Sequence, residues 1–266
     1  MTTVFQSAFR PPRPIIPVDN SRMELQAELR ASIESLYETF SAYPLPRFTD
    51  PCLHCHTVED EAKLHSMPLR DLGVAELRDY IADALLVWGG VTDFKHFLPR
   101  IYELYVTVPD PAMELLDPEM ILSKFRYGQW RTWPLPEQLA VEAFLHALWG
   151  EILGTPPPAD CFTDVESWLC AIAQAEDDLT PYLNQWINDQ RLSASFALSS
   201  MLLSSAVARS GSTGRNAFWE DRGEQYAQVQ HWIKTPAVFE KLERAHAASH
   251  GAPSESEFEA AMQILI

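Results

Sequence analysis

The sequence predicts an all-α protein, and three observations support this. Apolar residues recur with a period close to 3.6 along most of the 266 residues, and each periodic segment ends at Pro, Gly or a polar turn. No segment shows the strict alternation of a half-buried strand. We expect stacked helical hairpins, either as an irregular solenoid of the HEAT or tetratricopeptide kind or as a compact multi-helix domain.

The N-terminal part, residues 1–19, is expected to be an extended arm, because its four prolines between Pro11 and Pro17 exclude a helix. A helix should follow. Its apolar stripe runs from Leu25 to Phe40 behind an Asn20 cap and ends before Pro44.

Two further stripes predict a helical hairpin. One runs from Val74 to Trp88 and stops at Gly89-Gly90, and the other runs from Phe94 to Tyr105 and stops before Pro109. Further helices are expected over residues 111–127, 136–153, 162–176, 179–190, 192–209, 216–233, 236–249 and 254–264.

The best internal break is the proline-rich segment 155–160. It divides the chain into an N-terminal helical half, residues 20–154, and a C-terminal helical half, residues 161–266. The same segment is equally consistent with a surface loop inside one continuous domain.

Composition limits the classes of partner. Lys and Arg total 20 against 37 Asp and Glu, and the formal charge of −17 repels nucleic-acid phosphates and anionic membranes but attracts a basic protein. Residues 1–9 lack the pattern of a secretory signal, so we expect a cytoplasmic protein with reduced cysteines. The longest uncharged stretch, 192–208, contains six serines and is a poor membrane span.

The segment Cys52-Leu53-His54-Cys55-His56 concentrates two thiols and two imidazoles. A Cys-x-x-Cys knuckle supplies two of the four ligands that a structural zinc ion needs. We expect His65 and His96 to complete the set, with His54 and His56 as alternates. His96 faces away from the apolar stripe of its helix, where Pro99 adds an irregularity, so it is free to meet another element.

Other chemistries at this segment stay open. Covalent haem attachment would need export, which the N-terminus does not indicate. A redox dithiol is disfavoured because the acidic run Glu59-Asp60-Glu61 should raise the pKa of the thiols. Two reduced cysteines without a ligand are a further alternative. An open zinc position with one of these carboxylates as base would instead make a hydrolase-type enzyme.

Three weaker patterns are also present. Glu142 and His146 lie one helical turn apart, as do His246 and His250, and we interpret them as a surface ion pair and as a favourable helix C-terminus. The acidic run at 176–178 is expected to cap the helix that begins near Thr180.

Three blocks, namely the Cys-x-x-Cys segment, the Trp88-Gly89-Gly90 turn and residues 93–100 (DFKHFLPR), together resemble an uncharacterised family of bacterial proteins that pairs them in this order. The resemblance covers roughly residues 40–105. It implies only that the blocks form one unit, because that family has no assigned activity.

These observations predict a non-enzymatic, cytosolic helical interaction protein with a structural zinc site. An adaptor or a toxin-neutralising, immunity-like protein with a basic partner is the specific form we expect. A zinc-dependent hydrolase and a thiol redox sensor are the alternatives.

Overall fold

The computed structural model describes residues 20–107, 116–155, 164–204, 216–252 and 254–266. Within these ranges the protein is all-α, as predicted, and contains no β-strand. The predicted arm, residues 1–19, and most of the proline-rich break lie outside the described residues. The α-helices are α1 (Asn20–Phe40), α2 (Val58–Leu64), α3 (Val74–Asp83), α4 (Val91–Thr107), α6 (Pro118–Tyr127), α7 (Leu135–Gly154), α8 (Val165–Ala175), α9 (Thr180–Asn188), α10 (Leu192–Ser204), α11 (Gly223–Trp232), α12 (Pro236–Ala248) and α13 (Glu255–Ile264). Three short 3-10 helices are η1 (Leu69–Asp71), η2 (Trp130–Thr132) and η4 (Ala217–Arg222).

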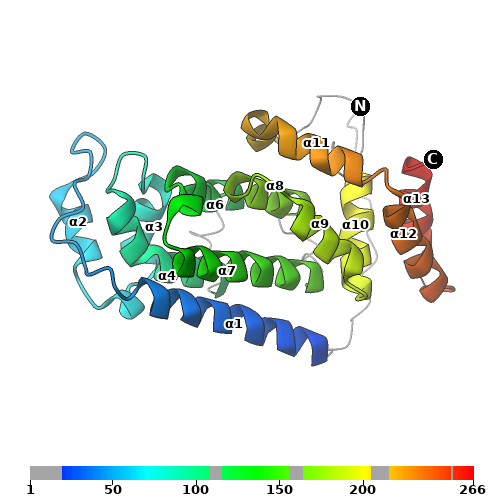
Figure 1. The fold of residues 1–266 in the computed structure, drawn as a ribbon, viewed down its shortest axis with the longest axis horizontal. Helices are drawn as coiled ribbons and strands as arrows, with labels where there is room; N and C mark the ends of the chain where they lie inside the picture. Colours follow the sequence, from blue (N-terminus) through cyan, green and yellow to red (C-terminus); the bar gives the residue numbers. More distant parts are fainter. Residues whose placement is uncertain (1–19, 108–115, 156–163, 205–215, 253) are drawn as a thin grey trace, which may run out of the picture.

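The helices pack as a compact bundle rather than as a solenoid. Helix α1 lies along α7 and also contacts α4, and α6 packs against α8 (Figure 1). In a solenoid each repeat contacts only its neighbours in the sequence, whereas α1 and α7 are far apart along the chain. Of the two architectures that the sequence allowed, the compact multi-helix domain therefore fits and the repeat has no support.

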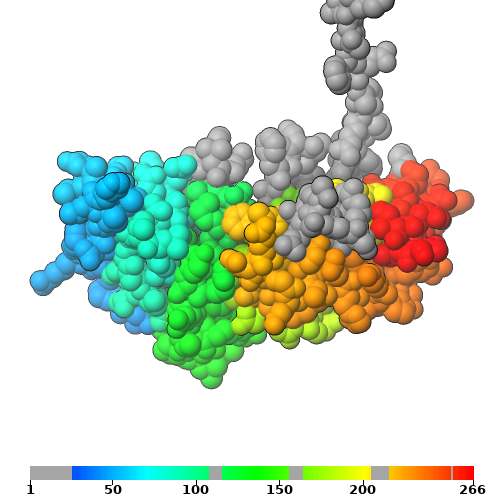
Figure 2. Space-filling model, turned by 90° about the horizontal axis from the view of Figure 1, so that it is seen from above, coloured from blue at the N-terminus to red at the C-terminus, as the bar shows by residue number. Residues whose placement is uncertain are grey.

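One hydrophobic core cluster runs through the described residues from Leu29 in α1 to Ala261 in α13. It includes residues on both sides of the predicted break, because α7 contacts α8, α9 and α10. Figure 2 shows the order of the chain along the molecule, with α2 and α3 at one end and α12 and α13 at the other. None of the described helices combines the length and the apolar character that crossing a bilayer requires.

Helix α3 ends earlier than its apolar stripe predicts. The stripe continues to Trp88, but the helix stops at Asp83, and Leu85 takes a left-handed φ of 65°. The ammonium group of Lys124 in α6 donates hydrogen bonds to the carbonyls of Ala82 and Ala84, at 2.6 and 3.0 Å. A buried cation from another helix thus satisfies this helix end, and burial lowers the pKa of Lys124 to about 8.

A second charged group lies buried near the same helices. Glu119 in α6 is only 2 % exposed and accepts a hydrogen bond of 2.5 Å from Asn216. Burial raises the pKa of Glu119 to about 7, which places its titration near neutral pH.

Candidate functional site

The two cysteines of the Cys-x-x-Cys segment lie in one tight turn, residues 52–56, which we call the thiol turn. The amides of Cys55 and His56 both donate to the Cys52 carbonyl, at 2.9 and 3.0 Å. Both cysteines are reduced, and Cys55 is exposed while Cys52 is partly exposed. The turn therefore presents a vicinal dithiol to solvent.

The thiol turn is anchored through a buried network centred on Glu61 of α2. Its carboxylate accepts hydrogen bonds from the amide of Thr49 at 2.7 Å, from the Thr49 hydroxyl and from the Trp88 indole at 3.1 Å. The Cys52 amide donates to the carbonyl of Val87 at 2.9 Å. The turn is thus tied both to α2 and to the segment that follows α3.

The pKa values of the two thiols move in opposite directions. Hydrogen bonds from the backbone amides of His54 and Cys55, and then from the Cys55 thiol, lower the pKa of Cys52. Donation to the Cys52 sulfur, and the charge of that sulfur, raise the pKa of Cys55. The expectation that flanking carboxylates raise both values is therefore wrong for Cys52, because the backbone amides of the turn stabilise its thiolate.

The predicted zinc ligands have other partners. His65 donates from Nε2 to Glu61 at 3.0 Å, and His96 donates from Nδ1 to the Tyr43 carbonyl at 2.8 Å. Of the alternates, His56 is buried against Trp88, with its Nε2 3.0 Å from the Asp83 carboxylate, and His54 is exposed.

This arrangement does not assemble a zinc site. No three His, Cys, Asp or Glu side chains of the described residues gather closely enough to hold a metal ion. The zinc set of Cys52, Cys55, His65 and His96 stays a prediction that these contacts do not favour, since both imidazoles are engaged elsewhere.

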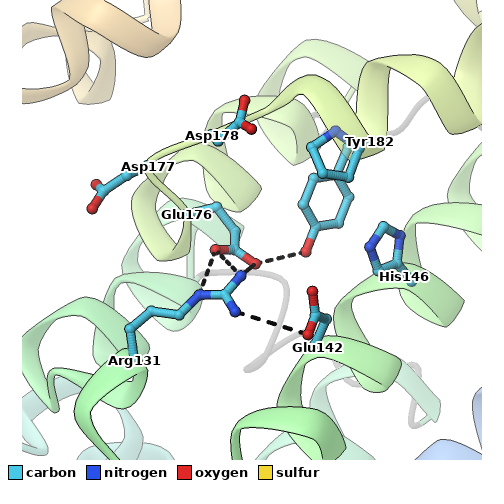
Figure 3. Close-up of a pocket in the computed structure, with 8 residues that line it drawn as sticks. Arg131, Glu142, His146, Glu176, Asp177, Asp178 and Tyr182 are labelled. Carbon is cyan, nitrogen blue, oxygen red and sulfur yellow. Dashed lines mark hydrogen bonds and ion pairs between the residues drawn. The ribbon is translucent and has the colours of Figure 1, made fainter.

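A second candidate site is a cavity of about 300 Å³ between η2, α7 and the loop that joins α8 to α9. We call it the acidic pocket. Figure 3 shows its labelled side chains, and the lining consists of Arg131, Glu142, His146, Glu176, Asp177, Asp178, Pro181 and Tyr182. Glu142 and Glu176 lie beside the Arg131 guanidinium, whereas Asp177 pairs with Arg222 at 2.8 Å and Asp178 points away from Arg131 (Figure 3).

The guanidinium of Arg131 is already paired at the base of this pocket. It donates to both oxygens of Glu176, with Nη2 at 2.8 and 2.7 Å, and the Tyr182 hydroxyl donates to the same carboxylate at 2.9 Å. Glu176 is 3 % exposed. Burial raises the pKa of Glu176, and the Arg131 hydrogen bonds oppose that shift. The charge of Arg131 is therefore largely neutralised within the pocket.

Glu142 and His146 line the opposite side, one helical turn apart on α7. The Glu142 carboxylate lies 3.8 Å from Arg131, a distance too long for a hydrogen bond, so it keeps acceptor capacity. The His146 ring stacks on Tyr182 with 4.4 Å between centroids, and its Nδ1 donates to the Gln185 side chain at 2.8 Å. The pocket thus combines a flat aromatic wall with an available carboxylate (Figure 3).

The sequence indicated several of the residues that line this pocket, but not that they lie together. The spacing of Glu142 and His146 and the acidic run at 176–178 are separate patterns in the sequence. Asp178 accepts from the Thr180 amide at 2.9 Å, but the N-cap residue of α9 is Leu179, which makes no side-chain capping bond. Arg131 carried no recognisable signal, because only the fold brings η2 beside the end of α8. His246 and His250 both lie near Glu255, at 3.7 and 2.8 Å.

The three blocks that carry the family resemblance lie against one another. Pro51 forms an isolated bridge with Trp88, and the Gly90 amide donates to Asp93 at 2.9 Å. Comparison with protein-family models, curated proteins and solved structures found no match to this chain.

Proposed function

We propose that the protein is a non-enzymatic, cytosolic helical interaction protein, and that its acidic pocket binds a Lys or Arg side chain of a basic protein partner. The observation that carries the proposal is the charge balance of the pocket. Four carboxylates line it, of which Glu176 is already paired with Arg131 and Asp177 with Arg222, while Glu142 keeps acceptor capacity. An additional cation is therefore attracted, whereas an anion would meet uncompensated negative charge.

The dimensions and walls of the pocket suit one long basic side chain. A cavity of about 300 Å³ accommodates a single guanidinium or ammonium group with its aliphatic stem. The His146 ring, which is stacked on the buried Tyr182, offers a flat surface against which such a group can lie. Glu142 supplies a carboxylate for bidentate pairing.

The overall charge acts in the same direction. A formal charge of −17 steers a basic partner towards the protein and raises its association rate at low ionic strength. A buried Arg anchor inside a polar rim is a common arrangement at protein interfaces. An adaptor and a toxin-neutralising protein are the two forms of this function that such a surface fits.

The proposal can be tested with peptides of defined charge. Isothermal titration at low ionic strength would compare a blocked tri-arginine peptide with a tri-citrulline peptide, which has the same shape without the charge. We expect the arginine peptide to bind at least about tenfold more tightly, equivalent to about 1.4 kcal/mol. Glu142→Gln should remove most of this difference.

A matched control separates the pocket from the general field. The variant Glu28→Gln removes the same charge from an exposed position on α1. It should change the affinity less than about twofold, because a distant exposed charge is screened. Equal binding of both peptides, or equal effects of Glu142→Gln and Glu28→Gln, would contradict the proposal.

A further inference from the structure

The thiol turn has the geometry of a site for reversible disulfide formation. The Cys55 amide donates to the Cys52 carbonyl at 2.9 Å, which is the hydrogen bond of a β-turn. Residues at the ends of such a turn have Cα atoms less than about 7 Å apart. A disulfide needs a Cα separation of about 4.4 to 6.8 Å, and a β-turn brings its two end residues close to this range.

The surroundings fix this turn while leaving its sulfurs accessible. On the N-terminal side, Thr49 is bonded to Glu61, and the Cys52 amide is bonded to Val87. On the C-terminal side, the buried His56 ring packs on Trp88 with 4.2 Å between centroids. Neither anchor uses a sulfur atom, and both thiols are open to solvent. A small reagent can therefore reach them in the folded protein.

We propose that Cys52 and Cys55 form a thiol modification site, which a low-molecular-weight disulfide of the glutathione class oxidises reversibly to an intramolecular disulfide. Either thiol can begin the exchange, because Cys55 is exposed and Cys52 is partly exposed, and the other then closes the disulfide.

The reaction balances as a thiol–disulfide exchange in two steps. One cysteine thiolate attacks one sulfur of the small disulfide, its S–S bond breaks, and the released thiolate takes up the proton that this cysteine lost. The other cysteine thiol then loses its proton and attacks the cysteine sulfur of the mixed disulfide, and the second small thiolate leaves and takes up that proton. The protein loses two hydrogens and two electrons, and one small disulfide becomes two thiols.

The test uses the full chain and oxidised glutathione as the probe. After incubation, acid quenching and alkylation, trypsin releases both cysteines in one peptide, residues 48–63, because it cleaves after Arg47 and Lys63. We expect this peptide from the wild type to be two hydrogens lighter and unalkylated, and dithiothreitol should restore both thiols. Cys55→Ser and Cys52→Ser should each retain one glutathione on the remaining cysteine, because the second thiol that would release it is absent.

Three results would overturn the proposal. One is a wild-type peptide in which both thiols remain alkylatable after the incubation. Another is a mixed disulfide that persists in the wild type, since the second thiol would then be out of reach. The third is a zinc ion bound by Cys52 and Cys55 in the purified protein, found by elemental analysis, lost in Cys52→Ser and blocking oxidation.

Discussion

The variant Glu61→Gln tests whether the buried carboxylate of α2 holds the thiol turn in place. One oxygen of Glu61 accepts from the Thr49 amide and from His65, and the other accepts from the Thr49 hydroxyl and from Trp88. Glutamine has the same shape but replaces one acceptor with an NH₂ donor. In place of Oε1 the new donor faces the Thr49 amide, and in place of Oε2 it faces the Trp88 indole, which keeps a second acceptor in the Thr49 hydroxyl at 2.6 Å.

The size of the effect follows from these contacts. Leaving a buried donor without its partner costs about 1–3 kcal/mol, and replacing a charged acceptor weakens the bonds that remain. Because the Trp88 indole keeps the Thr49 hydroxyl as a partner, we expect Glu61→Gln to lower the free energy of unfolding by about 2 kcal/mol at pH 7. Urea denaturation followed by circular dichroism should show a lower midpoint with an unchanged slope.

The pH dependence supplies a second measurement. Burial raises the pKa of Glu61, but the hydrogen bonds from Thr49, His65 and Trp88 outweigh it, and the net pKa is lowered. Because the folded pKa lies below the unfolded one, the ionised carboxylate stabilises the fold above the unfolded pKa, and this contribution is lost as pH falls through the folded pKa. The difference between wild type and Glu61→Gln should shrink below about pH 4.

The control is Glu59→Gln, which removes a charge from an exposed position in the first turn of the same helix. Its effect should stay below about 1 kcal/mol, the size of a helix-dipole interaction. If Glu61→Gln destabilises the protein no more than Glu59→Gln does, or if its effect is the same at pH 7 and pH 3, the carboxylate does not hold the turn.

Three further predictions concern other buried charges. Glu119→Gln should raise the free energy of unfolding by about 3 kcal/mol at pH 8 but leave it unchanged below pH 4. The reason is that the folded pKa of about 7 lies above the unfolded one, so the stability of the wild type falls as pH rises from the unfolded pKa to 7. The same difference between wild type and variant at both pH values in thermal denaturation would refute this. Because the folded pKa of Lys124 lies below the unfolded one, urea titrations of the wild type should show stability rising between about pH 8 and pH 10. Lys124→Met should abolish this rise. Arg131→Ala should lower the free energy of unfolding by about 2 kcal/mol, a moderate value because the Arg131 side chain is half exposed. In a double-mutant cycle, adding Glu176→Gln should recover most of this loss. Additive losses would show that the two side chains are not coupled.

The helices could be predicted because the signal that defines them is local. A period of 3.6 and a boundary residue are properties of one segment, and α1 ends at Phe40, before Pro44, as the stripe predicted. The end of α3 could not be predicted in this way. It depends on Lys124, which lies in another helix and satisfies the carbonyls of Ala82 and Ala84. An apolar stripe that continues through Trp88 gives no sign of that contact.

The acidic pocket could not be predicted from the sequence either, because its residues come from different elements. Glu142 and His146 were recognisable as neighbours because one helix carries both. Their meeting with Arg131 and Glu176 depends on how η2 and the end of α8 pack against α7, which is a property of the whole fold. A charge pattern along the sequence could show that the protein is acidic, but not where one carboxylate would remain available.

The structure of the thiol turn explains why the acidic run in the sequence predicted the wrong direction for the pKa shift of Cys52. Of the acidic run that follows the turn, Asp60 accepts from the Thr57 amide and pairs with Lys63 at 2.7 Å, and Glu61 is held inside its own network. The carboxylate that acts on Cys55 is Asp83, which is distant in the sequence. Cys52 instead faces backbone amides of its own turn, and these exist only once the turn has formed. A thiol pKa therefore reports the donors that the folded backbone points at the sulfur, and the charge of the surrounding sequence is a poor substitute for them.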